Sequence, residues 1–139
     1  YFIMLQPTSP FRDTDDIDSA LSKLIGSNYD SIVSIVDVGG FHPLRMKKVD
    51  KAGMLINYIK QDGENMIPRQ KLKSVYIRNG SIYASKRNVL SKYQSLVGAS
   101  CLPYIMSSEK SINIDSEIDF KIAQRIIMDK WNEQRYSKS

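Results

Sequence analysis

The sequence contains a single cysteine, Cys101, among its 139 residues. One cysteine cannot form an internal disulfide, and a chain without a disulfide framework is typical of a reducing cytoplasm. No stretch approaches 18 uninterrupted apolar residues, so we expect no membrane-spanning helix. The N-terminus also lacks the charged segment, long apolar core and cleavage site of a signal peptide. The sequence therefore predicts a cytoplasmic protein.

Signatures of several common ligand sites are absent as well. There is no P-loop, no GxGxxG fingerprint and no zinc-ligand spacing. The only histidine, His42, precedes Pro43 and has no serine, cysteine or acid at a spacing that suggests a catalytic pair. We expect His42 to be structural and Cys101 to be an inert thiol.

The composition is that of a soluble globular domain, with 42% hydrophobic and 25% charged residues. A length of 139 residues makes one domain or a large piece of one. The chain begins at Tyr1 and enters the apolar run 2–5 at once, which is typical of the interior of a sheet. We therefore expect a fragment of a longer protein.

The net charge of +5 is unevenly distributed along the chain. Residues 1–44 carry a net −4, residues 45–92 carry a net +9, and residues 93–139 balance. A positive middle third favours an anionic ligand or partner, such as phosphate, carboxylate, nucleic acid or an acidic protein face. A solvated, lysine-rich face has the same composition, so charge alone leaves both interpretations open.

The first third of the chain predicts a strand, a helix and a second strand. Residues 2–5 are too short and apolar for an amphipathic helix and predict a strand buried on both faces. Two prolines then make residues 6–10 a rigid loop. A helix starts at Asp13 or Thr14, and residues 31–36 predict a second buried strand. Such strand–helix–strand units build parallel sheets. The buried stripe of the helix comprises Ile17, Ala20, Leu21, Leu24 and Ile25.

The middle of the chain has a different pattern. Residues 45–49 and 54–56 predict a surface hairpin with a glycine in its turn. Residues 75–77 and 81–84 predict strand segments that are separated by a break at 78–80.

The last third combines short elements with a long helix. A short helix is predicted over residues 86–93 and a strand over 101–106, where Pro103 implies a sheet edge or the beginning of a strand. Residues 111–115 alternate polar and apolar side chains as an extended segment does. A final helix follows, with Asp119 as the N3 acid of a capping-box pair. Its predicted buried side comprises Ile118, Ile122, Ala123, Ile126 and Ile127.

Asn113 and Asp115 form the first candidate site. Two residues apart on an extended segment, their side chains point the same way. Carboxylate and carboxamide oxygens suit Mg²⁺, which keeps several waters and meets substrate phosphates. The alternative is that Asp115 and Ser116 only cap the following helix, and the spacing leaves both interpretations open.

The second candidate cluster combines Arg69 with Asn79 and Tyr83. An arginine can hold a carboxylate or phosphate through two parallel hydrogen bonds. Asn79 precedes Gly80 and could instead be a turn residue, and the Tyr83 ring could simply fill a core.

The segment Leu5-Gln6-Pro7-Thr8-Ser9-Pro10-Phe11-Arg12 resembles the LQPTSPLR signature of the acylneuraminate cytidylyltransferases, also called CMP-sialic acid synthetases. The later motifs fall in that family's order, and the resemblance covers about residues 2–128. These motifs are Ser34-Ile35-Val36, His42-Pro43-Leu44, Pro68-Arg69-Gln70, Asn79-Gly80-Ser81-Ile82-Tyr83 and the run from Ser111 to Asp119.

The resemblance implies an enzyme that transfers CMP from CTP to a nine-carbon acidic sugar and releases pyrophosphate with the help of Mg²⁺. It implies a Rossmann-like, three-layer α/β nucleotidyltransferase fold. An inserted β-rich segment at roughly 42–80 would carry the contacts of a homodimer.

The same resemblance implies roles for individual residues. Gln6, Asn79 and Tyr83 match positions that line the family's acidic-sugar pocket. Arg69 matches an arginine on the dimerisation segment that reaches the neighbouring subunit's site. Arg45 lies where a basic residue plays a similar part.

The metal motif and its surroundings are where this sequence departs from the family. Asp115 matches the second aspartate of the IDID motif and is the expected catalytic and metal-binding residue. The first aspartate is replaced by Asn113, a neutral ligand that would weaken any second metal. Many relatives have an arginine where this chain has Ile77, with Arg78 next to it, and a legionaminic or pseudaminic acid substrate would explain that difference. The family's nucleotide-binding loop has no counterpart here, so we expect the isolated chain to be inactive.

Two other functions are compatible with parts of the sequence. A basic nucleic-acid-binding module would use residues 45–92, but that segment lacks the aromatic and basic interleaving of an RNA-recognition sheet and any helix-turn-helix pattern. A non-catalytic dimerisation or scaffold piece would differ only in lacking activity. We expect CTP and an acidic sugar as ligands, with no nucleic-acid or membrane partner.

Overall fold

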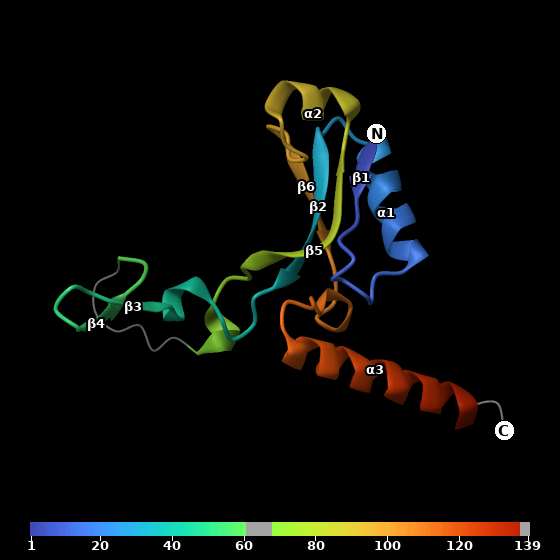
Figure 1. Cartoon of the computed structure of the whole chain (residues 1–139). Coiled ribbons are helices and arrows are strands. Elements are labelled where there is room, and N and C mark those ends of the chain that lie inside the picture. Colours follow the sequence, from blue (N-terminus) through green and yellow to red (C-terminus); the bar gives the residue numbers. More distant parts are fainter. Residues whose placement is uncertain (61–67, 137–139) are drawn as a thin grey trace. The chain divides into compact units, whose positions relative to one another are not determined.

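The computed structural model describes residues 1–60 and 68–136, apart from the side chains of Arg69 and residues 132–136. The chain divides into two compact units, Tyr1–Val36 with Arg78–Ser139, and Asp37–Ile77 (Figure 1). The second unit lies close to the boundaries of the predicted insertion at 42–80, whose role in dimerisation stays a prediction.

The first unit is built on a four-stranded sheet with the strand order β1-β5-β2-β6. β5 runs antiparallel to β1, whereas β2 and β6 are parallel. Main-chain bonds from Lys86 N to Asp30 O and from Val38 N to Val75 O pair β5 antiparallel with β2 as well. The strands are β1 (Phe2–Met4), β2 (Ser31–Asp37), β5 (Tyr76–Ser85) and β6 (Cys101–Ile105).

The predicted α/β class is confirmed, but the sheet is mixed rather than parallel. β5, which comes from residues far along the chain, lies between β1 and β2 and opposes both. Strand order depends on such long-range pairing, which the local pattern of residues 2–36 does not contain.

β1 is an edge strand of this sheet. Phe2, Ile3 and Met4 are each exposed by about two fifths, at 43%, 38% and 40%. The predicted strand is therefore confirmed, but its predicted burial on both faces is wrong. Within the described part of the chain β1 has one neighbouring strand, β5.

Helix α1 (Thr14–Ile25) covers one face of the sheet. It begins with a capping box in which Asp13 and Asp16 each accept a hydrogen bond from the other's main-chain N–H, and it ends at Gly26. The predicted start of this helix is confirmed. Its buried residues form a core with the sheet that comprises Ala20, Leu24, Ile32, Ile82 and Ala84.

β5 runs without interruption through residues 78–80, where the sequence predicted a break. Gly80 has φ +78°, a left-handed conformation that disturbs the strand without ending it. A Cβ atom at this position would collide with the side-chain oxygen of Gln6. The positive φ favours glycine at position 80, and a larger residue would also displace the end of the Gln6 side chain.

Pro103 lies in β6 at the other edge of the sheet, as predicted. Met106 N donates to Ile35 O of β2 at 2.9 Å, so by alternation residue 103 faces away from β2. Proline has no N–H to offer on that side, and the Pro103 carbonyl accepts a 2.9 Å bond from Lys23 Nζ.

The remaining helices of this unit are α2 (Arg87–Tyr93) and α3 (Glu117–Tyr136). The predicted short helix over 86–93 is confirmed, and so is the capping box of α3 between Ser116 and Asp119. The predicted burial of the isoleucine stripes is wrong in part, because no described element covers these side chains. Ile25 is 58% exposed in α1, and in α3 Ile118, Ile122 and Ile127 are 67%, 47% and 53% exposed, whereas Ala123 is buried.

The unit Asp37–Ile77 contains a two-stranded hairpin, as predicted. β3 (Lys47–Val49) and β4 (Leu55–Asn57) are antiparallel, with Val49 opposite Leu55. Gly53 supplies the positive φ of the turn, at +82°. Two short 3₁₀ turns flank the hairpin, η1 (Pro43–Arg45) and η2 (Arg69–Lys71).

Within the residues that the structure describes, no helix has the length and apolar character needed to cross a bilayer.

Candidate functional site

The loop that follows β1 is fixed onto β5. Arg12 Nη1 donates to the Ser81 carbonyl at 2.8 Å and to the Gln6 carbonyl at 3.3 Å. Ser9 turns back on the loop through its N–H, which donates to Gln6 O at 3.2 Å, and its hydroxyl reaches Asn79 O at 3.5 Å. These bonds fix the main chain of the loop, and the Gln6 side chain lies against Gly80, so the structure brings Gln6 and the Asn79 segment together.

The same loop is bonded to the segment that precedes α3. Ile114 N donates to Thr8 O at 2.8 Å. The 3₁₀ turn η3 (Glu109–Ser111) occupies the start of the predicted extended run 111–115, and Ile112 after it is extended. The Gln6 loop and the Asn113–Asp115 segment are nevertheless neighbours.

Asn113 and Asp115 lie together, as their spacing suggested. Asn113 Nδ2 donates to Asp115 Oδ2 at 2.7 Å. The other polar atom of the amide, Asn113 Oδ1, is buried and has no hydrogen-bond partner among the described residues. A buried oxygen of this kind lacks the partner that such atoms normally have. Rotating the amide by half a turn would place this oxygen beside the Asp115 carboxylate.

This pair of side chains fits part of a Mg²⁺ site. One charged and one neutral oxygen match a Mg²⁺ ion that takes its other ligands from water and phosphate. The described residues contain no group of three or more His, Cys, Asp or Glu that could hold a metal. Metal binding at Asn113 and Asp115 stays a prediction.

The cap of α3 does not use the Asp115 carboxylate. Asp119 Oδ2 accepts from Ser116 N at 2.8 Å and from Asp115 N at 3.2 Å, and Ser116 Oγ accepts from Asp119 N at 3.4 Å. The Ser116 hydroxyl also donates to Asp119 Oδ2 at 2.7 Å, and this bond is the main cause that lowers the pKa of Asp119 below its ordinary value. Ser116 and Asp119 therefore cap the helix, which leaves the exposed Asp115 carboxylate available.

Asn79 is a buried junction of several segments. Its Oδ1 accepts from Ser34 Oγ at 2.5 Å, and its Nδ2 donates to Ser111 Oγ at 2.8 Å and to Met106 Sδ at 3.3 Å. The residue is only 6% exposed. Both polar atoms of the amide are engaged within the protein. Asn79 lies within β5, so the alternative of a turn residue is wrong, and a role in sugar binding stays a prediction.

Tyr83 lies on the sheet face opposite α1. Ile82 and Ala84 belong to the core under α1, so the alternating Tyr83 faces the other way. It pairs across the sheet with Met4, two residues before Gln6. The structure thus places Tyr83 beside the strand that leads into the Gln6 loop.

A charged cluster that the sequence did not reveal holds the segment before Ser111. Lys110 Nζ contacts Asp13 Oδ2 at 2.6 Å and Asp16 Oδ2 at 2.9 Å, and the Tyr104 hydroxyl donates to Asp16 Oδ1 at 3.2 Å. The hydrogen bond from Lys110 lowers the pKa of Asp13 to about 2, and the bond to Asp13 raises the pKa of Lys110. Burial is the largest cause that raises the pKa of Tyr104. No local pattern connects residues so far apart in the sequence.

The two predicted arginines belong to the unit Asp37–Ile77. Arg45 ends η1 and is exposed, whereas Arg69 begins η2 and its side chain lies outside the described residues. Their predicted contact with a sugar stays untested.

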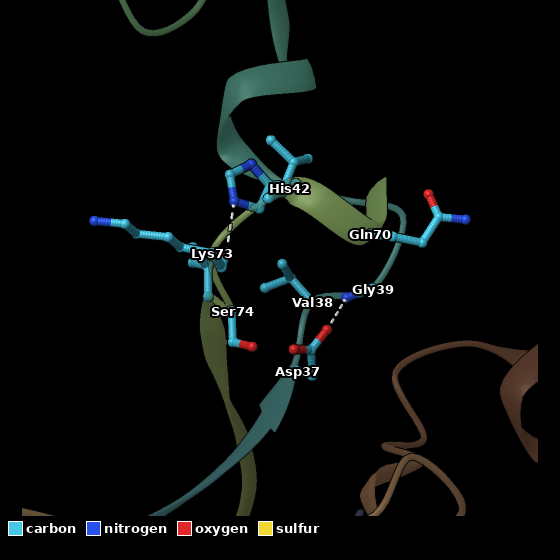
Figure 2. A pocket seen from close by; sticks show the side chains of 9 residues that line it. Asp37, Val38, Gly39, His42, Gln70, Lys73 and Ser74 are labelled. Carbon is cyan, nitrogen blue, oxygen red and sulfur yellow. Dashed lines mark hydrogen bonds between the residues drawn. The ribbon is translucent and has the colours of Figure 1, made fainter. Parts of the chain in front are cut away.

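This unit contains a cavity of about 460 Å³ next to His42 (Figure 2). His42 Nδ1 accepts from Leu44 N at 3.2 Å, so Nε2 carries the proton and donates to Lys73 O at 3.1 Å. Both ring nitrogens are engaged, which agrees with a structural histidine. The cavity is lined by Asp37, Val38, Gly39, His42, Gln70, Leu72, Lys73, Ser74 and Val75.

Comparison with known proteins gives distant but consistent similarity. The chain is 27% identical over 128 residues to the post-translational flagellin modification protein B of Campylobacter coli, covering 92% of this chain and 53% of that protein. It is 29% identical over 129 residues to the CMP-N,N'-diacetyllegionaminic acid synthase of Legionella pneumophila, covering 90% and 53%. It is 29% identical over 119 residues to an N-acylneuraminate cytidylyltransferase of Streptococcus agalactiae, covering 86% and 28%. No protein-family model matches the chain.

Over most of its length the chain is thus a distant homologue of N-acylneuraminate cytidylyltransferases and CMP-N,N'-diacetyllegionaminic acid synthases, which confirms the resemblance carried by the motifs. The chain spans about half of the first two relatives and about a quarter of the third.

Proposed function

We propose that this protein is a cytidylyltransferase that transfers CMP from CTP to a sialic-acid-like nine-carbon sugar and releases pyrophosphate. Distant homology over about nine tenths of the chain supports this activity. The observation that carries it is the 2.8 Å bond between Thr8 O and Ile114 N, which joins the two segments with the most specific motifs. A Rossmann-like, three-layer arrangement is part of the same proposal.

In the proposed reaction the sugar's anomeric hydroxyl attacks the α-phosphorus of CTP. The new P–O bond forms as the bond to pyrophosphate breaks, and the hydroxyl proton leaves to solvent or to a base. Such reactions depend mainly on positioning the reactants and on neutralising phosphate charge. The protein's task is therefore to hold two anions in line.

Gln6, Asn79 and Tyr83 would contact the sugar. Gln6 is half-buried, and its amide lies against Gly80 at the end of β1. Arg45 and Arg69 would hold the sugar carboxylate from the partner subunit, since a guanidinium binds a carboxylate through charge-assisted bonds.

Asp115 would hold Mg²⁺, assisted by Asn113. The exposed Asp115 carboxylate supplies the formal charge, and the buried Asn113 Oδ1 supplies a second oxygen. When bound, the ion neutralises the charge of the triphosphate. In this proposal the sugar-binding residues of this chain orient the sugar. Asp115 and Asn113 fix the position of the ion that neutralises the phosphate charge.

A homodimer is part of the proposal. The unit Asp37–Ile77 exposes apolar side chains that a partner surface would cover. The most exposed are Phe41 at 82%, Leu55 at 70%, Val49 at 68%, and Met54 and Tyr58 at 61%.

The test uses the protein expressed from its own reading frame. It is incubated with CTP and Mg²⁺ and with N-acetylneuraminic acid or N,N'-diacetyllegionaminic acid, and the CMP-sugar is measured by chromatography. We expect product with at least one sugar, and Gln6→Ala should raise the KM for that sugar about tenfold, the effect of roughly 1.4 kcal/mol. Gln124→Ala, on the exposed surface of α3, should leave the KM unchanged. Absence of product with every nine-carbon acid would overturn the proposal.

A further inference from the structure

A second cavity, of about 410 Å³, lies within the unit that contains the four-stranded sheet. Val33 and Ile35 of β2 line it and alternate with Ile32, which packs under α1. The cavity is therefore on the sheet face opposite α1. Its lining comprises Val33, Ile35, Arg78, Ser95, Val97, Cys101, Leu102 and Pro103.

Arg78 and Asn79 are adjacent in β5, and their side chains lie on opposite faces of the sheet. The Asn79 amide bonds to Ser34, which lies on the α1 side because it is two residues after Ile32. Arg78 lines the cavity with Val33 and Ile35 on the other side. The cavity is thus separate from the buried Asn79 junction.

The Arg78 guanidinium is the one cationic group in an otherwise mostly apolar lining. It makes no hydrogen bond or ion pair with any residue that the structure describes. Small-molecule sites are typically apolar hollows of roughly 300–1,000 Å³ in which a few polar groups fix the ligand's orientation. An arginine that has no partner among the described residues and lies beside aliphatic side chains favours an anion with an apolar body, because each part of such a ligand then has a partner.

We propose that this cavity binds a small amphipathic carboxylate, with the carboxylate on Arg78 and the apolar body against Val33, Ile35 and Val97. This site goes beyond the proposed transferase reaction, whose sugar is polar over its whole surface. Its occupancy is measured without any assay of CMP transfer, so the two proposals can fail independently.

Cys101 provides the readout. It is exposed, lines the same cavity and is the only cysteine in the sequence. Alkylation by iodoacetamide therefore reports on this site alone. We expect octanoate to slow the alkylation in a saturable manner, and the neutral analogue octanamide to need about tenfold higher concentration, the difference that about 1.4 kcal/mol produces. N-acetylneuraminic acid should give no protection.

Two variants separate a specific ion pair from general charge attraction. Arg78→Gln should raise the octanoate concentration needed for protection about tenfold and leave that for octanamide unchanged. Arg87→Gln, an exposed arginine at the start of α2 that does not line the cavity, should change neither. Shifts of the Val33 and Ile35 methyl resonances on adding octanoate to the unaltered protein give a second measurement that needs no variant. Unprotected Cys101, equal octanoate protection in Arg78→Gln, an equal loss in Arg87→Gln, or unmoved methyl resonances would each overturn the proposal.

Discussion

The Ser34 hydroxyl donates a 2.5 Å hydrogen bond to Asn79 Oδ1, and both residues are buried. Ser34 Oγ also accepts from Ile82 N at 2.7 Å. It therefore joins β2 to β5 at the point where the Asn79 amide turns toward Ser111. Buried polar atoms have no water to replace a lost partner, so each of these bonds matters for stability.

Ser34→Ala should lower the free energy of unfolding by about 1–3 kcal/mol, because it leaves buried acceptors and donors unpaired. Urea denaturation measures the change. Ser91→Ala is the matched control, since that exposed hydroxyl bonds only within α2, to Asn88 O. The control should stay within about 0.5 kcal/mol of the unaltered protein. Equal losses in the two variants would show that the Ser34 bonds contribute nothing specific.

Comparing Gly80→Ala with Gly53→Ala separates the stability cost of backbone strain from the cost of a collision between the new Cβ atom and a neighbouring side chain. Both glycines have positive φ, at +78° and +82°, so alanine at either position costs about 1–2 kcal/mol. Gly53 has open space around it, whereas a Cβ on Gly80 meets Gln6. We expect a larger fall in the denaturation midpoint for Gly80→Ala, together with weaker sugar binding by calorimetry. Identical effects would mean that Gln6 moves aside at no cost.

Asp115→Asn should leave thermal stability nearly unchanged, because Ser116 and Asp119 form the cap. Activity should fall at least about 100-fold, which needs roughly 2.7 kcal/mol of lost transition-state stabilisation. Mn²⁺ binding, followed by electron paramagnetic resonance, should weaken in parallel, and Asn113→Asp should tighten it. Ser116→Ala should show the opposite pattern to Asp115→Asn: it should lower the free energy of unfolding by about 1 kcal/mol and leave metal binding unchanged. Full activity of Asp115→Asn at limiting Mg²⁺ would remove Asp115 from the metal site.

The contact between Lys110 and Asp13 predicts a pH dependence at the acid end. The folded pKa of Asp13, about 2, is below the ordinary 3.8, so its contribution to stability is fully present above about pH 4. That contribution is lost as the pH falls from about 4 to 2. In Lys110→Gln the Asp13 carboxyl should titrate closer to 3.8 by NMR. Lys121→Gln, which removes an exposed pair with Glu117, should leave the Asp13 titration in place.

Leu55→Glu tests the proposed dimer. Leu55 lies opposite Val49 in the hairpin, and the two are 70% and 68% exposed. A charge there should convert a dimer to a monomer in sedimentation, because a buried unpaired carboxylate is costly. Ile25→Glu, at a 58% exposed position of α1, should leave the dimer intact. A monodisperse monomer in the unaltered protein would contradict the dimer directly.

Local patterns predicted most of the elements of this chain. The α1 cap, the hairpin around Gly53, the short helix α2 and the α3 capping box all depend on residues within a few positions of one another. Signals of this kind are contained in the sequence itself.

What could not be predicted depends on distant parts of the chain. Three features join distant residues: the position of β5 between β1 and β2, the Lys110 contacts with Asp13 and Asp16, and the Ser34 bond to Asn79. The bonded residues are 37 to 97 positions apart in the sequence. The prediction of which side chains are buried was partly wrong for the same reason. A side chain such as Ile118 carries the pattern of a buried position, but exposure depends on whether another element covers it.

The two edges of the four-stranded sheet differ in their capacity to accept another strand. At β6, Pro103 offers no outward N–H, and its carbonyl is already taken by Lys23. At β1, residues Phe2–Met4 carry no such block. Unpaired strand edges are templates on which a foreign strand can grow, and natural proteins disable them with features such as proline and lysine. Among the residues that the structure describes, β1 is therefore the edge of this sheet at which a further strand could pair, whereas β6 is blocked.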